Sequence, residues 1–175
     1  MLPRAVTVLL EPKLVLRGCI LNLTPALLAH YGIKGLVLDV DDTIISTRSA
    51  VVLPDVQAWI DEVKQVARVS LVSNNLSHAR ISRIAGVLDL PYLFCARKPS
   101  RRKVRQAVAD MNLAMNEVAM VGDRLFTDVV VGNRLGMFTV LVEPMLDASG
   151  DRRHTSCLRS LEIWISRRLG AKVRI

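Results

Sequence analysis

Short aliphatic runs alternate along this chain with segments of helical periodicity. The runs rich in Val, Leu and Ile predict buried strands near residues 35–40, 68–74, 92–96, 118–123 and 137–143. The segments between them predict helices near residues 54–66, 77–88, 100–113 and 127–135. Continuous apolar strands that alternate with helices are typical of a parallel sheet covered on both faces. We therefore expect an α/β fold with a parallel sheet of about five strands.

Two further helices are expected outside this alternating region. The stretch "LTPALLAHYGIKG" predicts a short capped helix before the first strand, and residues 154–169 predict a terminal helix. The apolar and basic positions of the terminal helix fit either packing on the domain or lying on an anionic membrane. No internal repeat or low-complexity linker interrupts the chain, so we expect a single domain over residues 1–175 with its core at about 20–145.

Charge and composition narrow the classes of partner. The chain of 175 residues is 51% hydrophobic and has a formal net charge of +8. A basic surface favours acidic partners, which include phosphorylated substrates, nucleic acid and anionic lipid. No apolar run approaches the roughly 20 residues needed to span a bilayer, and the cysteines show no metal-ligand spacing. We therefore expect a cytoplasmic protein with free thiols.

Polar residues follow four of the predicted strands at the point where each strand ends. In chain order these residues are Asp39 and Asp41, Ser73 and Asn74, Lys98, and Asp123. The carboxyl ends of parallel strands meet at one edge of a sheet, and ligands bind in the crevice beyond that edge. The sequence therefore predicts one site that combines carboxylates, a hydroxyl group and an ammonium group.

These side chains have the chemistry that phosphoryl transfer needs. The carboxylates of Asp39, Asp41 and Asp123 can chelate one Mg²⁺, which prefers oxygen ligands and keeps waters that a phosphate can displace. One carboxylate can attack phosphorus, and another, its pKa raised by a like charge nearby, can act as a general acid. Lys98 and Ser73 can hold the phosphoryl oxygens as charge shifts in the transition state. The expected reaction proceeds through an aspartyl-phosphate intermediate.

Four short motifs resemble those of haloacid dehalogenase (HAD) phosphatases and occur in the same order. They are "DVDDT" at 39–43, "SNN" at 73–75, "KP" at 98–99 and "GDRLFTD" at 122–128. Two longer stretches, "LTPALLAHYGIKGLVLDVDDT" and "VGDRLFTDVVVGNRLGMFTVLV", resemble the YqeG-like, class IIIA branch of this superfamily, which includes phosphatidylglycerophosphate phosphatases. The resemblance implies a phosphoric monoester hydrolase with a HAD-like Rossmannoid fold.

The resemblance also implies a role for each motif residue. Asp39 would be the nucleophile, and Asp41 would protonate the leaving oxygen, activate water and offer a backbone carbonyl to Mg²⁺. Lys98 would serve both catalysis and phosphate binding, and Thr43 would brace the loop. The residues expected to line the substrate site are Thr43, Ser73, Asn74 and Lys98. Those expected at the metal are Asp39, Asp41, Asp123 and Asp128, with Asp128 supporting either the metal or Lys98.

The chain departs from the family pattern in two respects. Asp42 stands where the YqeG-like branch commonly has Asn, and no cap domain fits, because a helix and a strand occupy each of the segments 44–72 and 76–97. An uncapped site would be open and would suit a bulky substrate or one presented at a surface. The expected partner is a phosphorylated substrate, with anionic phospholipid and peripheral contact at the inner membrane face as the more specific expectation.

Three other functions fit parts of the sequence. A receiver-type signalling domain also uses an acidic pair, a hydroxyl residue and Lys-Pro, but there the Lys-Pro lies on the last strand, whereas further strands follow Lys98 here. A nucleic-acid-binding protein would use the basic run 97–105, but no aromatic stacking set accompanies it, so no nucleic acid is expected. A HAD phosphatase of a soluble phosphoester stays open, because nothing in the sequence distinguishes a lipid phosphate from a sugar phosphate.

Overall fold

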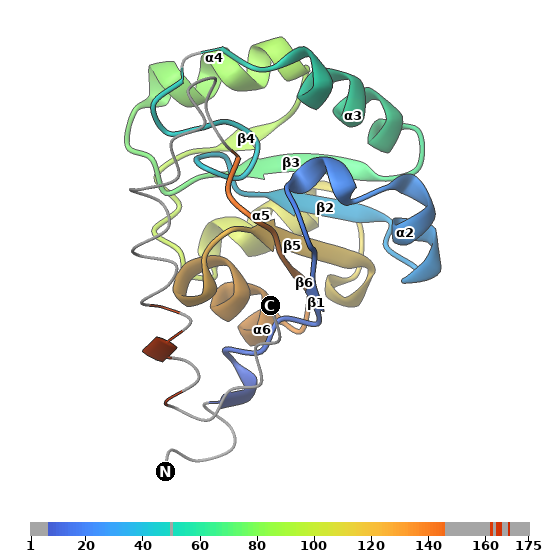
Figure 1. Ribbon diagram of the computed structural model, residues 1–175, viewed down its shortest axis with the longest axis vertical. Helices are drawn as coiled ribbons and strands as arrows, with labels where there is room; N and C mark the ends of the chain where they lie inside the picture. The colour runs from blue at the N-terminus through green and yellow to red at the C-terminus, as the bar shows by residue number, and fades with distance from the viewer. Residues whose placement is uncertain (1–6, 50, 146–161, 163, 166–167, 169–175) are drawn as a thin grey trace.

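The computed structural model describes residues 7–49, 51–145, 162, 164–165 and 168, and a parallel sheet forms its centre (Figure 1). Six strands lie in the order β1-β6-β5-β2-β3-β4, and every neighbouring pair is parallel. The strands are β1 (Leu14–Val15), β2 (Gly35–Leu38), β3 (Arg68–Val72), β4 (Tyr92–Leu93), β5 (Val118–Gly122) and β6 (Phe138–Leu141). The predicted α/β fold with a parallel sheet is therefore confirmed.

The sheet has one strand more than the sequence predicts. β1 pairs with β6, Leu14 beside Val140 and Val15 beside Leu141, and forms one edge of the sheet. The apolar run around β1, 14–16, has only three residues between Lys13 and Arg17, which is too short to show a hydrophobic period. The five predicted strands all form, although β4, at the opposite edge, is also reduced to 2 residues.

Helices cover both faces of the sheet (Figure 1). They are α2 (Pro25–His30), α3 (Pro54–Lys64), α4 (His78–Leu88), α5 (Arg102–Asp110) and α6 (Val130–Leu135). Leu36 and Leu38 of β2 belong to the buried cluster that α3 and α4 complete, whereas Val37 belongs to the cluster of α5 and α6. Successive side chains of a strand point to opposite faces, so β2 contributes to both hydrophobic cores.

Local signals in the sequence explain several helix boundaries. The hydroxyl groups of Thr24 and Ser77 cap α2 and α4, each accepting a backbone N–H from the first turn. Gly136 ends α6 in the left-handed conformation, with φ of 74°. The helix predicted near 127–135 differs in its first turn, which is the π-helical segment η3 (Leu125–Val129). Such turns are frequent at functional sites, and η3 carries one of the predicted site residues, Asp128.

The terminal helix predicted over 154–169 lies largely outside the described residues. Within it, Glu162, Trp164, Ile165 and Arg168 are described, and all are helical. In the part of the chain that the structure describes, no helix is long and apolar enough to cross a membrane. The extent of the domain, 1–175, stays a prediction.

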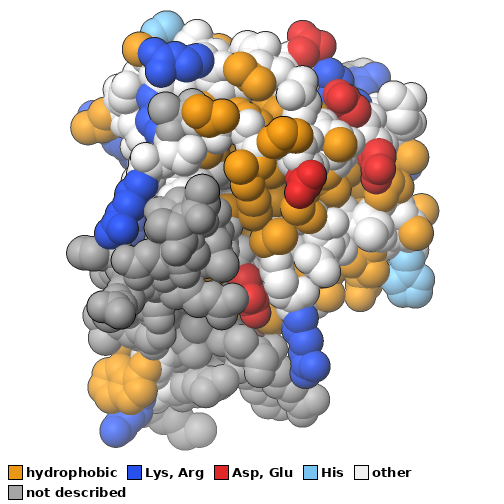
Figure 2. All heavy atoms as spheres, turned by 45° about the horizontal axis from the view of Figure 1, so that its top comes forward, with side chains coloured by type: hydrophobic (Ala, Val, Ile, Leu, Met, Phe, Trp, Pro, Cys, Tyr) orange, Lys and Arg blue, Asp and Glu red, His pale blue; other side chains and the backbone are white. Residues whose placement is uncertain are grey.

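Some large apolar side chains remain at the surface. Figure 2 shows hydrophobic side chains among charged ones on the face toward α3 and α4. Val51 and Leu76 are the most exposed of the large apolar residues described, at 69% and 75%. Both lie in loops that follow a strand and precede a helix, which places them at the edge of the sheet where the strands end.

Candidate active site

The strand order brings the predicted motif residues to one edge of the sheet. β2 lies between β3 and β5, and Asp39, Ser73 and Asp123 each stand directly beyond the end of one of these strands. The backbone N–H of Asp39 donates to the carbonyl of Val121 at 2.9 Å, which extends the pairing of β2 with β5 by one residue. Each of these three residues is buried, so their side chains are largely shielded from solvent.

Lys98 forms a buried double ion pair at this edge. Its Nζ lies 2.6 Å from Asp39 Oδ1 and 2.7 Å from Asp128 Oδ1. Burial opposes the charged form of the lysine, but the carboxylates of Asp128 and Asp39 outweigh it and raise the pKa of Lys98 above its ordinary value. The ammonium group therefore stays charged and holds two carboxylates from different motifs together.

A third carboxylate lies against this ion pair. Asp39, Asp123 and Asp128 each offer an oxygen within 4.8 Å of the others. Burial raises the pKa of Asp39 to about 7, with Lys98 opposing the rise and Asp128 adding to it. Burial likewise raises the pKa of Asp123 to about 8, with further contributions from the negative charges of Asp128 and Asp39. Three carboxylates therefore lie around one ammonium group, whose single positive charge cannot balance all of them.

The chemistry of this cluster fits a divalent cation. Asp123 Oδ1 is buried and has no hydrogen-bond partner among the described residues, and leaving a buried carboxylate oxygen unpaired is costly. Three ionised carboxylates and one ammonium group would leave two negative charges in excess. Carboxylate oxygens are the ligands that Mg²⁺ prefers, and one such ion would satisfy both the charge and the unpaired oxygen.

Gly122 allows Asp128 to approach the end of β5. A Cβ atom at position 122 would lie 2.7 Å from the Cβ of Asp128, closer than side chains pack. Asp128 also accepts a hydrogen bond from the Thr127 hydroxyl at 3.2 Å. The absence of a side chain at Gly122 therefore sets the position of a carboxylate six residues later in the chain.

Asp41 lies outside the cluster of three carboxylates. Its Oδ2 accepts a hydrogen bond from Asn75 Nδ2 at 2.9 Å, and its Oδ1 accepts from Arg80 Nε at 3.2 Å and from Arg80 Nη2 at 3.0 Å. Both carboxylate oxygens of Asp41 are thus held by donors from the segment that follows β3. The predicted pair Asp39 and Asp41 is divided between two environments, one around Lys98 and the other around Arg80.

Arg80 also fixes the loop that follows Asp41. Its Nη1 donates to the carbonyl of Ser49 at 2.5 Å, and its Nη2 donates to the carbonyl of Ser46 at 3.2 Å. One guanidinium group therefore contacts the carboxylate and two backbone carbonyls of the same loop. Sequence reasoning missed this residue, because an arginine in the first turn of a helix resembles any other basic surface residue.

Two of the residues predicted to bind the substrate, Ser73 and Asn74, form hydrogen bonds with backbone groups of the protein. The side-chain amide of Asn74 accepts from the backbone N–H of Lys98 at 2.6 Å and donates to the Lys98 carbonyl at 3.0 Å. Ser73 is buried, and its hydroxyl oxygen accepts from the Asn75 N–H at 2.9 Å. Thr43 is fully buried, and its hydroxyl has no partner among the described residues. Asn74 thus fixes the loop that carries Lys98.

The conformation at Asp42 explains which residue types suit this position. Asp42 has φ of 59°, in the left-handed region that Asn and Asp tolerate better than most residues other than glycine. Its Oδ1 accepts a hydrogen bond from the Thr47 N–H at 2.9 Å, which closes the loop. An Asn side chain offers the same acceptor oxygen, so the local geometry accommodates either residue.

A residue far along the chain also contacts this region. Glu162 is buried, and its carboxylate pairs with Arg124 Nη2 at 3.0 Å and accepts from the Leu125 N–H at 3.0 Å. Arg124 directly follows Asp123, so this contact ties the terminal part of the chain to the start of η3. The sequence contains no spacing signal for it, because the contact joins segments 37 residues apart.

Comparisons with known proteins identify relatives of this chain. The family model described as HAD-hydrolase-like matches residues 95–155. The Probable phosphatase YqeG of Bacillus subtilis is 33% identical over 132 residues, which are 75% of this chain and 76% of that protein. Phosphatidylglycerophosphate phosphatase 1 of Arabidopsis thaliana is 28% identical over 127 residues, but they make up only 36% of that longer protein.

A solved structure shows the same fold. A protein from Porphyromonas gingivalis, described as a predicted HAD-like family hydrolase, aligns over 74% of this chain and 98% of its own length, with a TM-score of 0.52 and 13% identity. Its likeness supports the fold, while the YqeG relative is similar enough in sequence and in length to place the chain in a family. The chain belongs to the YqeG family of HAD-like phosphatases.

Proposed function

We propose that this phosphatase hydrolyses phosphomonoesters with the help of Mg²⁺ and through an aspartyl-phosphate on Asp39. The observation that carries the proposal is the buried pairing of Asp39 with Lys98 beside Asp123 and Asp128. A purely structural ion pair would not need three carboxylates around a single ammonium group. A site that receives a cation and a phosphoryl group accounts for all four residues.

The first step joins Asp39 to phosphorus. A carboxylate oxygen of Asp39 bonds to phosphorus as the ester P–O bond breaks, and the leaving oxygen takes a proton from Asp41. Water then attacks phosphorus and gives its proton to Asp41, which releases inorganic phosphate and restores Asp39. Lys98, held at 2.6 Å from Asp39, orients the nucleophile and faces the oxygens on which charge develops.

Asp41 would pass its proton from a position set by Arg80 and Asn75. With both oxygens accepting hydrogen bonds, Asp41 is arranged here as the carboxylate base that receives a proton from water. To protonate the leaving oxygen, one of its oxygens must turn away from these donors toward the substrate. Arg80 and Asn75 are therefore assigned as positioning residues for the acid–base step.

Asp39, Asp123 and Asp128 would hold the metal ion, together with the backbone carbonyl of Asp41. When bound, Mg²⁺ would neutralise the carboxylates and the phosphate oxygens and so favour approach of the anionic nucleophile. Asp128 would serve both the metal and Lys98, since it lies 2.7 Å from the lysine. Ser73 and Thr43 would donate their hydroxyl hydrogens at the phosphate side, and Asn74 would keep Lys98 in place.

The proposed substrate is phosphatidylglycerophosphate, met at the inner face of the membrane. Two relatives, from Arabidopsis thaliana and Chlamydomonas reinhardtii, carry the name phosphatidylglycerophosphate phosphatase 1. Among the described residues, the segments between the motifs hold α3 and α4 and no inserted cap, so a head group still anchored in a bilayer could reach Asp39. A soluble phosphoester is the second candidate, because the same open site would admit it.

The test is a phosphatase screen in Mg²⁺ that includes phosphatidylglycerophosphate in mixed micelles. Asp39→Asn keeps the shape of the side chain but cannot attack phosphorus, so turnover of every substrate should fall by more than about 10³-fold. Turnover within tenfold of the parent enzyme would contradict the nucleophile assignment. Preference for a water-soluble ester over the lipid by a wide margin would refute the lipid substrate and leave the hydrolase mechanism standing.

A further inference from the structure

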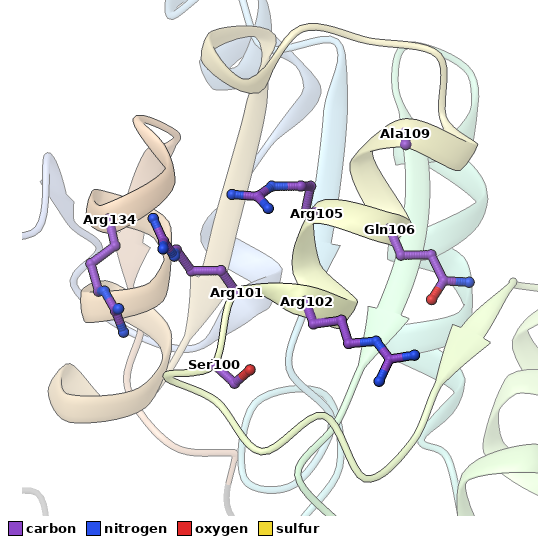
Figure 3. Close-up of a pocket in the computed structure, with 7 residues that line it drawn as sticks. All are labelled: Ser100, Arg101, Arg102, Arg105, Gln106, Ala109 and Arg134. Carbon is purple, nitrogen blue, oxygen red and sulfur yellow. The ribbon is translucent and has the colours of Figure 1, made fainter.

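A basic pocket of about 670 Å³ lies between α5 and α6 (Figure 3). The residues that line it are Ser100, Arg101, Arg102, Arg105, Gln106, Ala109 and Arg134. In Figure 3, Arg101 and Arg105 extend from the side of α5 toward α6, where Arg134 lies opposite. None of the proposed catalytic steps uses this pocket, so its charge needs a separate explanation.

The arginines of this pocket have no acidic partner among the described residues. Arg80 and Arg124, by contrast, each pair with a carboxylate. No Asp or Glu lines the pocket, and the polar contact of Arg134 is to a neutral group, the Pro99 carbonyl, 3.0 Å from its Nη1. Guanidinium groups gathered without carboxylates repel one another, and a bound anion relieves that repulsion.

The arrangement suits a phosphate group in particular. A guanidinium presents a rigid fork of N–H donors that matches two phosphate oxygens at once, so several arginines can share one phosphate. The pocket also adjoins the start of α5, a helix of 9 residues whose first N–H groups are not capped by a side chain. Those N–H groups and the helix dipole add further attraction for an anion. Ser100 supplies a hydroxyl donor at the same end.

The pocket is attached to the catalytic edge through the loop of Lys98. Arg134 donates a hydrogen bond to the carbonyl of Pro99, the residue that follows Lys98. The side chain of Asn74 accepts a hydrogen bond from the backbone N–H of Lys98 itself. Val51 and Leu76, which are 69% and 75% exposed, precede α3 and α4 at the edge where the strands end, and these helices cover the face of the sheet opposite to α5 and α6. Basic residues close to an anionic membrane surface are attracted to it, so the arginines of the pocket suit such a surface.

We propose that the arginine pocket binds the phosphate of an anionic phospholipid head group and seats the catalytic edge on the membrane. This proposal rests on the proposed lipid substrate and identifies the surface that would bring the enzyme to it. A nucleic acid fits less well, because the lining contains no aromatic side chain on which bases could stack, and the pocket is compact rather than an extended basic stripe.

Sedimentation of the full chain with vesicles tests the pocket without turnover. The probe is a vesicle of phosphatidylglycerol and phosphatidylcholine, in which phosphatidylglycerol offers a phosphodiester but no phosphomonoester to hydrolyse. The test variant is Arg101→Gln/Arg105→Gln, and the control is Arg17→Gln/Arg83→Gln, which removes the same charge from exposed positions elsewhere. Vesicles of phosphatidylcholine alone report binding that does not depend on anionic lipid.

The two variants should separate clearly. A basic residue near an anionic membrane contributes about fivefold to partitioning, so the test variant should sediment about 30-fold more weakly and the control variant less than about threefold. An equal loss of vesicle binding in both variants would mean that net charge alone drives binding, and would refute the pocket as the binding site. Tighter binding of single-stranded RNA than of vesicles at the same salt, lost in the test variant, would also overturn it.

The same measurement separates this proposal from the proposed reaction. Asp39→Asn should sediment like the parent protein although it cannot turn over substrate. If Asp39→Asn kept its activity while the pocket variant lost vesicle binding, the reaction mechanism would be wrong and the docking site would stand. If sedimentation were unchanged in the pocket variant while Asp39→Asn lost activity, only the docking site would be wrong. Circular dichroism of each variant checks that it is folded.

Discussion

Asp123→Asn should stabilise the metal-free protein at alkaline pH and remove its stabilisation by Mg²⁺. The carboxylate of Asp123 is buried, one of its oxygens has no partner, and Asp39 and Asp128 lie beside it. The amide of Asn keeps the shape of the side chain without the charge. The substitution therefore removes the electrostatic cost of the site in the absence of metal, and it also removes a proposed metal ligand.

The raised pKa of Asp123 determines the size and the direction of the pH effect on stability. The rise of the pKa from 3.8 to about 8 means that the folded state binds the proton more tightly than the unfolded state does. The free energy of unfolding therefore falls as the pH rises from about 4 to about 8. A pKa change of one unit corresponds to about 1.4 kcal/mol, so the loss of stability on ionisation of Asp123 is at most about 6 kcal/mol. Relaxation of the site should reduce this loss to about 2–4 kcal/mol.

Urea unfolding followed by circular dichroism measures this effect. With a chelator present, Asp123→Asn should match the parent near pH 4 and exceed its free energy of unfolding by about 2–4 kcal/mol near pH 8. Saturating Mg²⁺ should stabilise the parent at the higher pH and leave the variant nearly unchanged. Asp110→Asn, at an exposed position on α5, is the control for the loss of one negative charge.

Three outcomes would contradict this reasoning. If Asp123→Asn destabilised the metal-free protein near pH 8, the carboxylate would have a favourable partner that the geometry does not show. If Mg²⁺ stabilised the variant as much as the parent, Asp123 would not be a ligand. A pH dependence that persisted unchanged in the variant would assign the titration to another group, with Asp39 the first candidate because its pKa is also raised, to about 7.

Two further substitutions test the positioning of the site. Arg80→Gln should lower kcat by about 10–100-fold and change the shape of its pH profile, because Asp41 loses two of its three hydrogen bonds. Arg80→Lys should restore part of the activity. A fall in thermal stability with an unchanged pH profile would indicate that Arg80 has only a structural role. Gly122→Ala should cost about 1–3 kcal/mol and weaken Mg²⁺ binding, because the new methyl group would displace Asp128. Gly86→Ala, where nothing lies within 4 Å, is its control and should be neutral or slightly stabilising; equal effects of the two substitutions would contradict the close approach at Gly122.

The sequence by itself determined the helices and strands and the positions of the polar site residues at the strand ends. Aliphatic runs and helical periods depend on neighbours within a few residues, so five of the six strands and the main helices could be predicted from local pattern. Parallel strands deliver their carboxyl ends to one edge, so the convergence of Asp39, Ser73 and Asp123 followed from topology. The strand β1 escaped prediction because its apolar run, 14–16, is only three residues long and is bounded by Lys13 and Arg17.

The tertiary structure alone decided which side chains meet. Arg80 reaches Asp41 from another strand–helix unit, and Glu162 reaches Arg124 across 38 residues, through packing that no spacing in the sequence records. The same applies to the basic pocket, where Arg134 of α6 completes a group begun on α5. Local pattern determines where a chain is helical or extended, but the rotation and approach of packed elements determine the partners of each charged side chain.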